Sequence, residues 1–118
     1  MGVGYFLVNQ TRREVVWFLH IPANTKCEIA GNPVAAAITS WYLLEHAGDA
    51  IAFVSDSEDE WPFPHSTRPE LNGYRECTDD VVTALIDNGI LEDEGREIFD
   101  PKEPDVYMRR LRNIWMGY

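Results

Sequence analysis

Residues 5–20 of the chain read YFLVNQTRREVVWFLH, two apolar runs separated by a polar turn. The second run, Glu14–His20, is rich in β-branched and aromatic residues, and the polar residues 9–13 between the runs have the length of a hairpin connection. Two such runs joined by a short loop predict an antiparallel β-hairpin. Because proline donates no hydrogen bond to a sheet, Pro22 is expected to end the second strand.

The next segment has the features of a helix. Asn32 followed by Pro33 indicates a helix start, because Asn caps the first turn and Pro is tolerated at its first position. Helix-compatible residues continue to Ala47, Gly48 is placed to end the helix, and burial of most of its surface is expected. One or two helical turns are expected before it, over residues 23–30. Residues 50–55 carry no charge and predict a further strand, in the interior of the sheet.

The second half of the chain begins with a long irregular segment. Residues 56–73 contain Pro62, Pro64 and Pro69, which argue against regular structure, and loops of this length are usually functional or disordered. After it, Thr78 with two following Asp residues predicts a capped helix that ends at Asn88-Gly89. A small hairpin is then expected over residues 90–99, turning at Glu94-Gly95, and a final helix over residues 105–116.

These elements predict the fold class. At 118 residues the chain has the length of one domain, residues 1–118, and its 45% hydrophobic content suffices for a core. We expect a mixed α/β domain of the α+β type. It would consist of an N-terminal β-hairpin, a buried central helix, a further strand, and two more helices flanking a short hairpin.

The charge of the chain is concentrated in its second half. The net charge is −10, which argues against nucleic acid and an anionic membrane as partners, because both require clustered Lys and Arg. Residues 1–48 are neutral with three acids and three bases, residues 49–105 carry seventeen acids against four bases (net −13), and residues 106–118 carry a net charge of +3. The three bases of the last segment, Arg109, Arg110 and Arg112, are expected to pair with nearby acids.

Two acidic clusters follow from this distribution. The first lies beside aromatic residues that we expect to be exposed, and its candidate partner-binding residues are Asp56, Glu58, Asp59, Glu60, Trp61, Phe63 and His65. The second consists of Glu76, Asp79, Asp80, Asp87 and residues 92–94. Charge runs are usually solvated faces, but carboxylates around exposed aromatic rings also provide the steering charge and the apolar anchor of a protein interface.

The motifs for cofactor and metal chemistry are absent from the sequence, although a loose divalent-cation site made of carboxylates stays open. An EF-hand loop fails from Asp56 and from Asp87, because its glycine and glutamate positions are not occupied as required. Cys27 and Cys77 are fifty positions apart and predict buried thiols rather than a zinc or redox unit. No phosphate-binding glycine motif occurs, so no cofactor is expected. The N-terminus lacks the pattern of a signal peptide, and a cytoplasmic location is the expectation.

The chain has Gly4-Tyr-Phe-Leu-Val-Asn9 followed by Thr11, and later Gly31-Asn-Pro33 and Tyr42-Leu-Leu44. These motifs resemble those of a group of small uncharacterised proteins that open with Gly-Tyr-Phe-Leu-Val-Asn. The resemblance extends through Asp79 and residues 89–91 to the C-terminal segment. It implies no activity and no site residue, because none of the shared residues is a catalytic signature.

Three functions remain open at this point. The first is an acidic intracellular protein-binding module, such as an immunity or antitoxin-type inhibitor whose carboxylates cover a basic partner, for example a nuclease toxin. The second is a small enzyme that uses Asp/Glu groups and His65 in the 56–73 loop, which requires a pocket near Trp61. The third is a structural or assembly protein that associates through its aromatic C-terminal helix.

Overall fold

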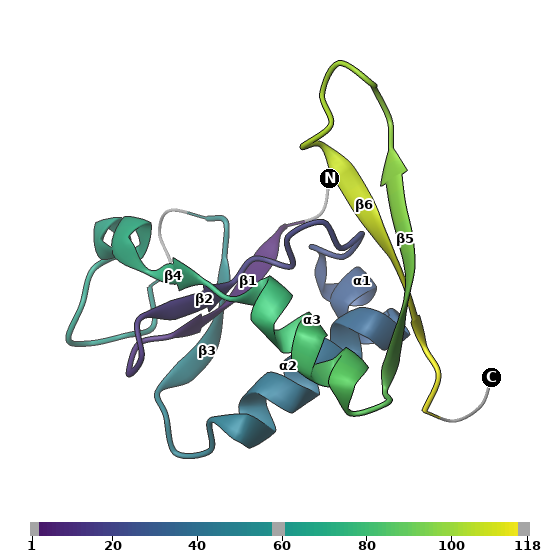
Figure 1. The fold of residues 1–118 in the computed structure, drawn as a ribbon. Helices are drawn as coiled ribbons and strands as arrows, with labels where there is room; N and C mark the ends of the chain where they lie inside the picture. Colours follow the sequence, from purple (N-terminus) through teal and green to yellow (C-terminus); the bar gives the residue numbers. More distant parts are fainter. Residues whose placement is uncertain (1–2, 58–60, 116–118) are drawn as a thin grey trace.

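The computed structural model describes residues 3–57 and 61–115. Figure 1 shows helices packed beside a main sheet, and a two-stranded ribbon that extends away from the rest of the protein. In chain order the elements are β1 (Tyr5–Asn9), β2 (Glu14–Val16), α1 (Lys26–Gly31), α2 (Pro33–Glu45), β3 (Ile51–Ser55), η1 (Arg68–Gly73), β4 (Arg75–Glu76), α3 (Thr78–Asp87), β5 (Leu91–Ile98) and β6 (Tyr107–Asn113). The predicted class, a small mixed α+β domain, is confirmed.

The predicted hairpin forms the centre of the main sheet. β1 and β2 pair antiparallel, and β3 and β4 are added on either side to give the order β3-β1-β2-β4. β3 runs antiparallel to β1, whereas the short β4 runs parallel to β2. β2 ends at Val16, well before Pro22, because the following residues Phe18 and His20 have φ angles of 57° and 63°, which interrupt an extended strand.

Both faces of the main sheet are covered. On one face, Leu7 packs with Ile38 and Tyr42 of α2 and with Val82 of α3 in a helix-side core. The opposite face is covered by residues 61–74, here named the loop layer. Its core consists of Phe6, Val8, Val15, Val54, Phe63, Leu71 and Tyr74. Because a strand directs successive side chains to opposite faces, this double burial explains why residues 5–8 contain no charged residue.

The prediction that β3 is an interior strand is wrong, because β3 lies at an edge of the main sheet. Its lack of charge has another cause. Val54 is buried in the core beneath the loop layer, and on the helix side the ring of Phe53 stacks on Phe18 with 6.4 Å between the ring centroids. The strand is therefore apolar because Val54 and, in part, Phe53 pack against the two cores, although β3 has only one neighbouring strand.

The helices begin largely as the sequence predicts. α2 starts at Pro33, and the side-chain oxygen of Asn32 accepts hydrogen bonds from the backbone N–H groups of Val34 (2.8 Å) and Ala35 (3.0 Å). It ends at Glu45, and only one of its faces is buried, whereas Leu44 is exposed. The short helix expected before it is α1. No helix among the described residues is long and apolar enough to cross a membrane.

Two details of the middle segment differ from expectation. Thr78 is the first residue of α3, and Cys77 occupies the cap position before it. The Thr78 hydroxyl does not cap the helix but accepts a hydrogen bond from the backbone N–H of Leu19 (3.4 Å). Residues 68–73 form the 3₁₀ helix η1 despite Pro69, because a proline in the first turn removes no hydrogen bond that the helix needs. The 56–73 segment is thus only partly irregular.

The C-terminal part of the chain differs most from the sequence prediction. Residues 91–98 form one strand, β5, without a turn at Glu94-Gly95, and the predicted helix over 105–116 is instead strand β6, which pairs with β5. The register shifts between Asp93 and Arg96, and Gly95 has a φ of 106°, so this glycine allows an irregularity within β5 rather than a reversal. We name the pair of strands with their connection, residues 91–113, the ribbon.

A pair of leucine variants tests the assignment of β1 to the centre of the core. Leu7 is buried, whereas Leu44 on α2 is 78% exposed. We expect Leu7→Ala to lower the free energy of unfolding by about 2–5 kcal/mol, because it leaves a cavity. Leu44→Ala is expected to change it by less than about 0.5 kcal/mol. Urea unfolding followed by circular dichroism measures both values, and equal effects would contradict the assignment.

Candidate functional site

The first acidic cluster is only partly a surface feature. Asp56 and His65 are exposed, and the Asp56 carboxylate accepts a hydrogen bond from the Gly4 backbone (3.1 Å). Trp61 is half-buried and Phe63 is only 6% exposed, so the prediction of exposed aromatic anchors here is wrong. Glu58, Asp59 and Glu60 lie outside the described residues.

The loop layer is held to the sheet by polar contacts as well as by its core. The indole N–H of Trp61 donates to Ser66 Oγ (3.2 Å), and the Ser66 hydroxyl donates to the side chain of Gln10 (2.9 Å), which directly follows β1. The Arg68 guanidinium lies 5.9 Å from the centre of the Trp61 ring and donates to the carbonyl groups of Ser55 (3.1 Å) and Ser57 (2.5 Å). Trp61 and Phe63, with 5.3 Å between their ring centres in an edge-on arrangement, therefore contribute to the fold.

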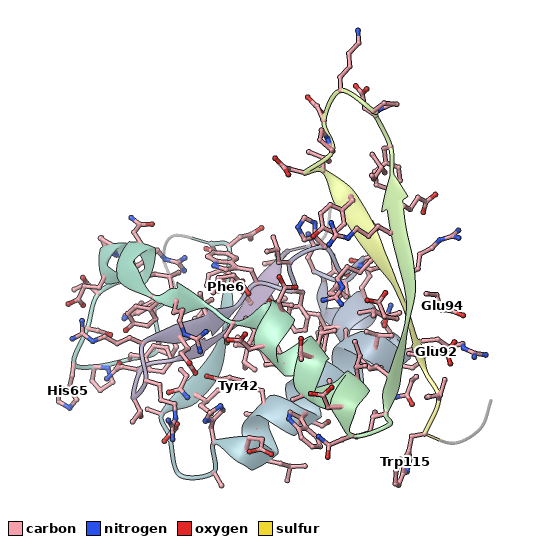
Figure 2. The ribbon with its side chains drawn as sticks, in the orientation of Figure 1. Phe6, Tyr42, His65, Glu92, Glu94 and Trp115 are labelled. Carbon is pink, nitrogen blue, oxygen red and sulfur yellow. The ribbon has the colours of Figure 1, made fainter. Side chains whose placement is uncertain are left out.

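Glu92 and Glu94 of the second acidic cluster lie on the side of the protein opposite to His65 (Figure 2). Figure 2 shows His65 at one side of the molecule and Glu92 and Glu94 at the other, where both carboxylates point away from the helices. Arg109 of β6 joins this region to the body of the domain, since it pairs with Asp79 of α3 (3.1 Å) and with Asp93 of β5 (3.2 Å). The backbone N–H of Gly95 and the Arg109 guanidinium lower the pKa of Asp93.

The carboxylates at the base of the ribbon are thus paired with arginines of β6. Arg112 lies 3.5 Å from a carboxylate oxygen of Glu92 and 3.7 Å from one of Glu94. The expectation that the three arginines pair with nearby acids is confirmed for Arg109 and Arg112, whereas Arg110 forms no ion pair within the described residues. Exposed ion pairs of this kind contribute little to stability, about 0–1 kcal/mol each, but they remove net charge from this part of the surface.

The ribbon is held to the domain at the left-handed turn that follows β2. The His20 ring stacks on Tyr107 of β6 with 3.7 Å between ring centroids, and the His20 carbonyl accepts a hydrogen bond from the backbone of Arg109 (2.9 Å). On β5, the Arg96 guanidinium lies over the Tyr107 ring at 4.5 Å from its centre. These contacts give the ribbon a defined direction, so the connection between its strands projects away from the domain (Figure 1).

The tip of the ribbon, residues 97–106, combines apolar and acidic groups. Ile98, Phe99 and Val106 are 49%, 62% and 56% exposed. The segment 97–105 carries four carboxylates against one lysine, a net charge of −3, and none of the four has an ion-pair partner in the described parts of the chain. These carboxylates belong to Glu97, Asp100, Glu103 and Asp105.

The sequence contains a local signal for the ribbon tip, but this signal is weaker than that of the two dense acidic clusters. Ile98 and Phe99 stand between acids and are followed closely by Pro101 and Pro104, a pattern typical of an exposed connection. The helix predicted over residues 105–116 would carry its aromatic side chains along one face. In the structure Tyr107 and Leu111 are half-buried on β6, so the predicted assembly interface on a C-terminal helix is not formed.

A polar cavity of about 390 Å³ opens between β2, α2 and α3. Along its wall the Tyr42 hydroxyl donates to Glu14 (2.8 Å), and Arg75 pairs with both Glu14 and Asp80. Burial and the hydrogen bond to Glu14 raise the pKa of Tyr42, and burial raises the pKa of the Cys77 thiol to about 12. A thiol that stays protonated near neutral pH is a poor nucleophile. The network therefore joins β2, α2, β4 and α3 without supplying an activated nucleophile.

The described residues give the enzyme and metal alternatives no support. Neither this polar cavity nor the apolar cavity described below is lined by a residue of the 56–73 segment. Among residues 3–57 and 61–115, no group of three His, Cys, Asp or Glu side chains is placed to hold a metal ion. The chain matches no protein-family model, no curated protein and no solved structure.

Two phenylalanine variants distinguish the loop layer from the ribbon tip. We expect Phe63→Ala to lower the free energy of unfolding by about 3–5 kcal/mol, because Phe63 fills the core beneath the loop layer. Phe99→Ala is expected to change it by less than about 0.5 kcal/mol, because the ring is largely exposed. Chemical denaturation of the two variants checks the assignment. An unchanged free energy of unfolding in Phe63→Ala would show that Phe63 is a surface residue and contradict the assignment.

The two cysteines are expected to differ in reactivity. The sequence predicts both thiols to be buried, but Cys27 is exposed and only Cys77 is buried. At pH 8 a thiol-specific reagent is expected to modify one cysteine rapidly in the native protein, because Cys77 is both covered and protonated. Cys27→Ser should abolish the fast phase, and Cys77→Ser should leave it intact. Rapid reaction of both thiols in folded protein would contradict this result.

Proposed function

We propose that the protein is an acidic protein-binding module and that the tip of the ribbon is its contact surface for a basic protein. The observation that carries this proposal is the exposure of Ile98, Phe99 and Val106 on a projecting connection whose carboxylates lack ion-pair partners among the described residues. Several exposed apolar groups that lie together and are rimmed by polar residues are typical of interaction sites.

The arrangement matches the physical requirements of a protein interface. Phe99 supplies an aromatic group with a large area to bury, and such groups dominate the free energy of association when they enter a pocket. The surrounding carboxylates accelerate association with a positively charged partner and disfavour acidic ones. The carboxylates at the ribbon base, by contrast, already form ion pairs with Arg109 or Arg112.

A basic protein that itself binds nucleic acid is the partner class that this chemistry favours. Such a protein presents arginines and lysines for phosphate groups, and carboxylates on a projecting ribbon take the place of those phosphates. An inhibitor of a nuclease toxin, of the immunity or antitoxin type, is the specific form of this proposal. Of the earlier candidate residues, Trp61 and Phe63 are not part of this surface, since they pack in the core beneath the loop layer.

The proposal is tested by capture of a partner from the native host and by measurement of the purified pair. We expect the immobilised protein to retain a basic protein at low salt, with slower association as salt increases. Phe99→Ala is expected to weaken binding at least about 30-fold, as for a central interface residue, and Leu44→Ala serves as the exposed apolar control. Surface plasmon resonance measures both rate constants.

Two outcomes count against the ribbon as the interface. One is equal affinity of Phe99→Ala and Leu44→Ala for the captured protein. The other is loss of binding when Glu58, Asp59 and Glu60 are replaced by lysine while charge reversal of Glu97, Asp100 and Glu103 leaves the affinity unchanged. Retention of no basic protein at all would overturn the proposed function itself.

A further inference from the structure

An apolar cavity of about 480 Å³ lies between the helices and the β3 edge of the main sheet. Tyr5 and Phe53 form its wall on the sheet, Ile29 and Ala30 belong to α1, and Ala36 belongs to α2. Its volume is within the range of small-molecule sites, about 300–1,000 Å³. None of these residues belongs to the ribbon or to the loop layer.

Small side chains and the sheet edge together leave this cavity open. The helices present alanines at positions 30 and 36, where larger side chains would fill the space above the sheet. Phe53 remains 38% exposed although it lies on the helix side, because no strand continues the sheet beyond β3. The result is a site with aromatic and aliphatic walls that the fold itself does not fill.

The charge at this cavity is opposite to that of the chain. Lys26 lines it, no carboxylate does, and Lys26 forms no ion pair within residues 3–57 and 61–115. The chain as a whole carries a net charge of −10. An unpaired ammonium beside an apolar cavity, in a protein otherwise rich in carboxylates, complements a ligand with an apolar body and an anionic end.

We propose that this cavity binds a small amphiphilic anion, namely a carboxylate with a linear alkyl chain. The alkyl chain lies against Tyr5, Ile29 and Phe53, and the carboxylate accepts a hydrogen bond from the Lys26 ammonium. Ser40, which also lines the cavity, adds a hydroxyl donor on α2, whereas the Thr39 hydroxyl is already bound to the Ala35 carbonyl (2.9 Å). This site is independent of the ribbon, so it stands or fails separately from the proposed function.

Isothermal titration calorimetry with hexanoate, octanoate and decanoate tests the proposal on the full chain. We expect saturable binding whose affinity increases about fourfold per added methylene until the cavity is filled. Octanol is expected to bind more weakly than octanoate, because its hydroxyl carries no negative charge, and octylamine more weakly still, because its ammonium is repelled by Lys26. Absence of binding by all three carboxylates at millimolar concentration, or equal binding of octanoate and octylamine, would overturn the proposal.

Variants test whether the ligand binds in this cavity and whether Lys26 contacts its carboxylate. Lys26→Gln is expected to weaken octanoate binding about tenfold and to leave octanol binding unchanged. The matched control is Lys102→Gln, the chain's other lysine, which lies on the ribbon connection. Ala36→Leu should abolish binding of both ligands by filling the cavity, with circular dichroism as the check on folding. Octanoate affinity that is unchanged in Lys26→Gln, or in folded Ala36→Leu, would contradict the assignment.

Discussion

Burial of β1 on both of its faces is the constraint on which the rest of the structure depends. Phe6, Leu7, Val8 and Asn9 are each at most 4% exposed, so the chain has to cover the sheet from two sides. The helices cover one side and the loop layer covers the other. Asn9, the polar residue of this group, can be buried because its side-chain N–H donates to Asp49 (2.9 Å) and its side-chain oxygen accepts from the backbone N–H of Arg12 (3.1 Å).

This constraint determines which aromatic side chains remain for other roles. Trp61 and Phe63 stand beside the densest acidic run of the sequence, yet the sheet requires them as part of its second core. The free energy that they contribute by burial, about 25 cal/mol for each Å² of apolar surface, is lost if either becomes an interface anchor. Large exposed apolar side chains also occur elsewhere, for example Leu44 and Trp115, but on the ribbon Ile98, Phe99 and Val106 are grouped at one tip.

The sequence predicts those parts of the fold whose signals are local. The hairpin at residues 5–16 and the cap at Asn32 are examples, because turn length and capping chemistry act within a few residues. The sequence predicts a helix over residues 105–116 because Tyr107 and Leu111 are four residues apart, which fits a helical face. The same residues also fit a strand, since Arg109 and Leu111 are half-buried while Arg110 and Arg112 are exposed. Pairing with β5 decides between the two periods, and a local pattern does not contain that information.

The sequence predicts an acidic and aromatic contact surface at residues 56–65, whereas the surface that we propose is the ribbon tip, and the reason for the difference is electrostatic. An acidic total does not reveal which carboxylates are paired. Arg109 pairs with Asp79 and Asp93 at the base of the ribbon, while the carboxylates of residues 97–105 have no such partner among the described residues. Folding gains nothing from exposing Phe99 among these unpaired charges. An exposed aromatic ring and uncompensated charge on one projecting connection are therefore better explained by a partner than by the stability of the domain.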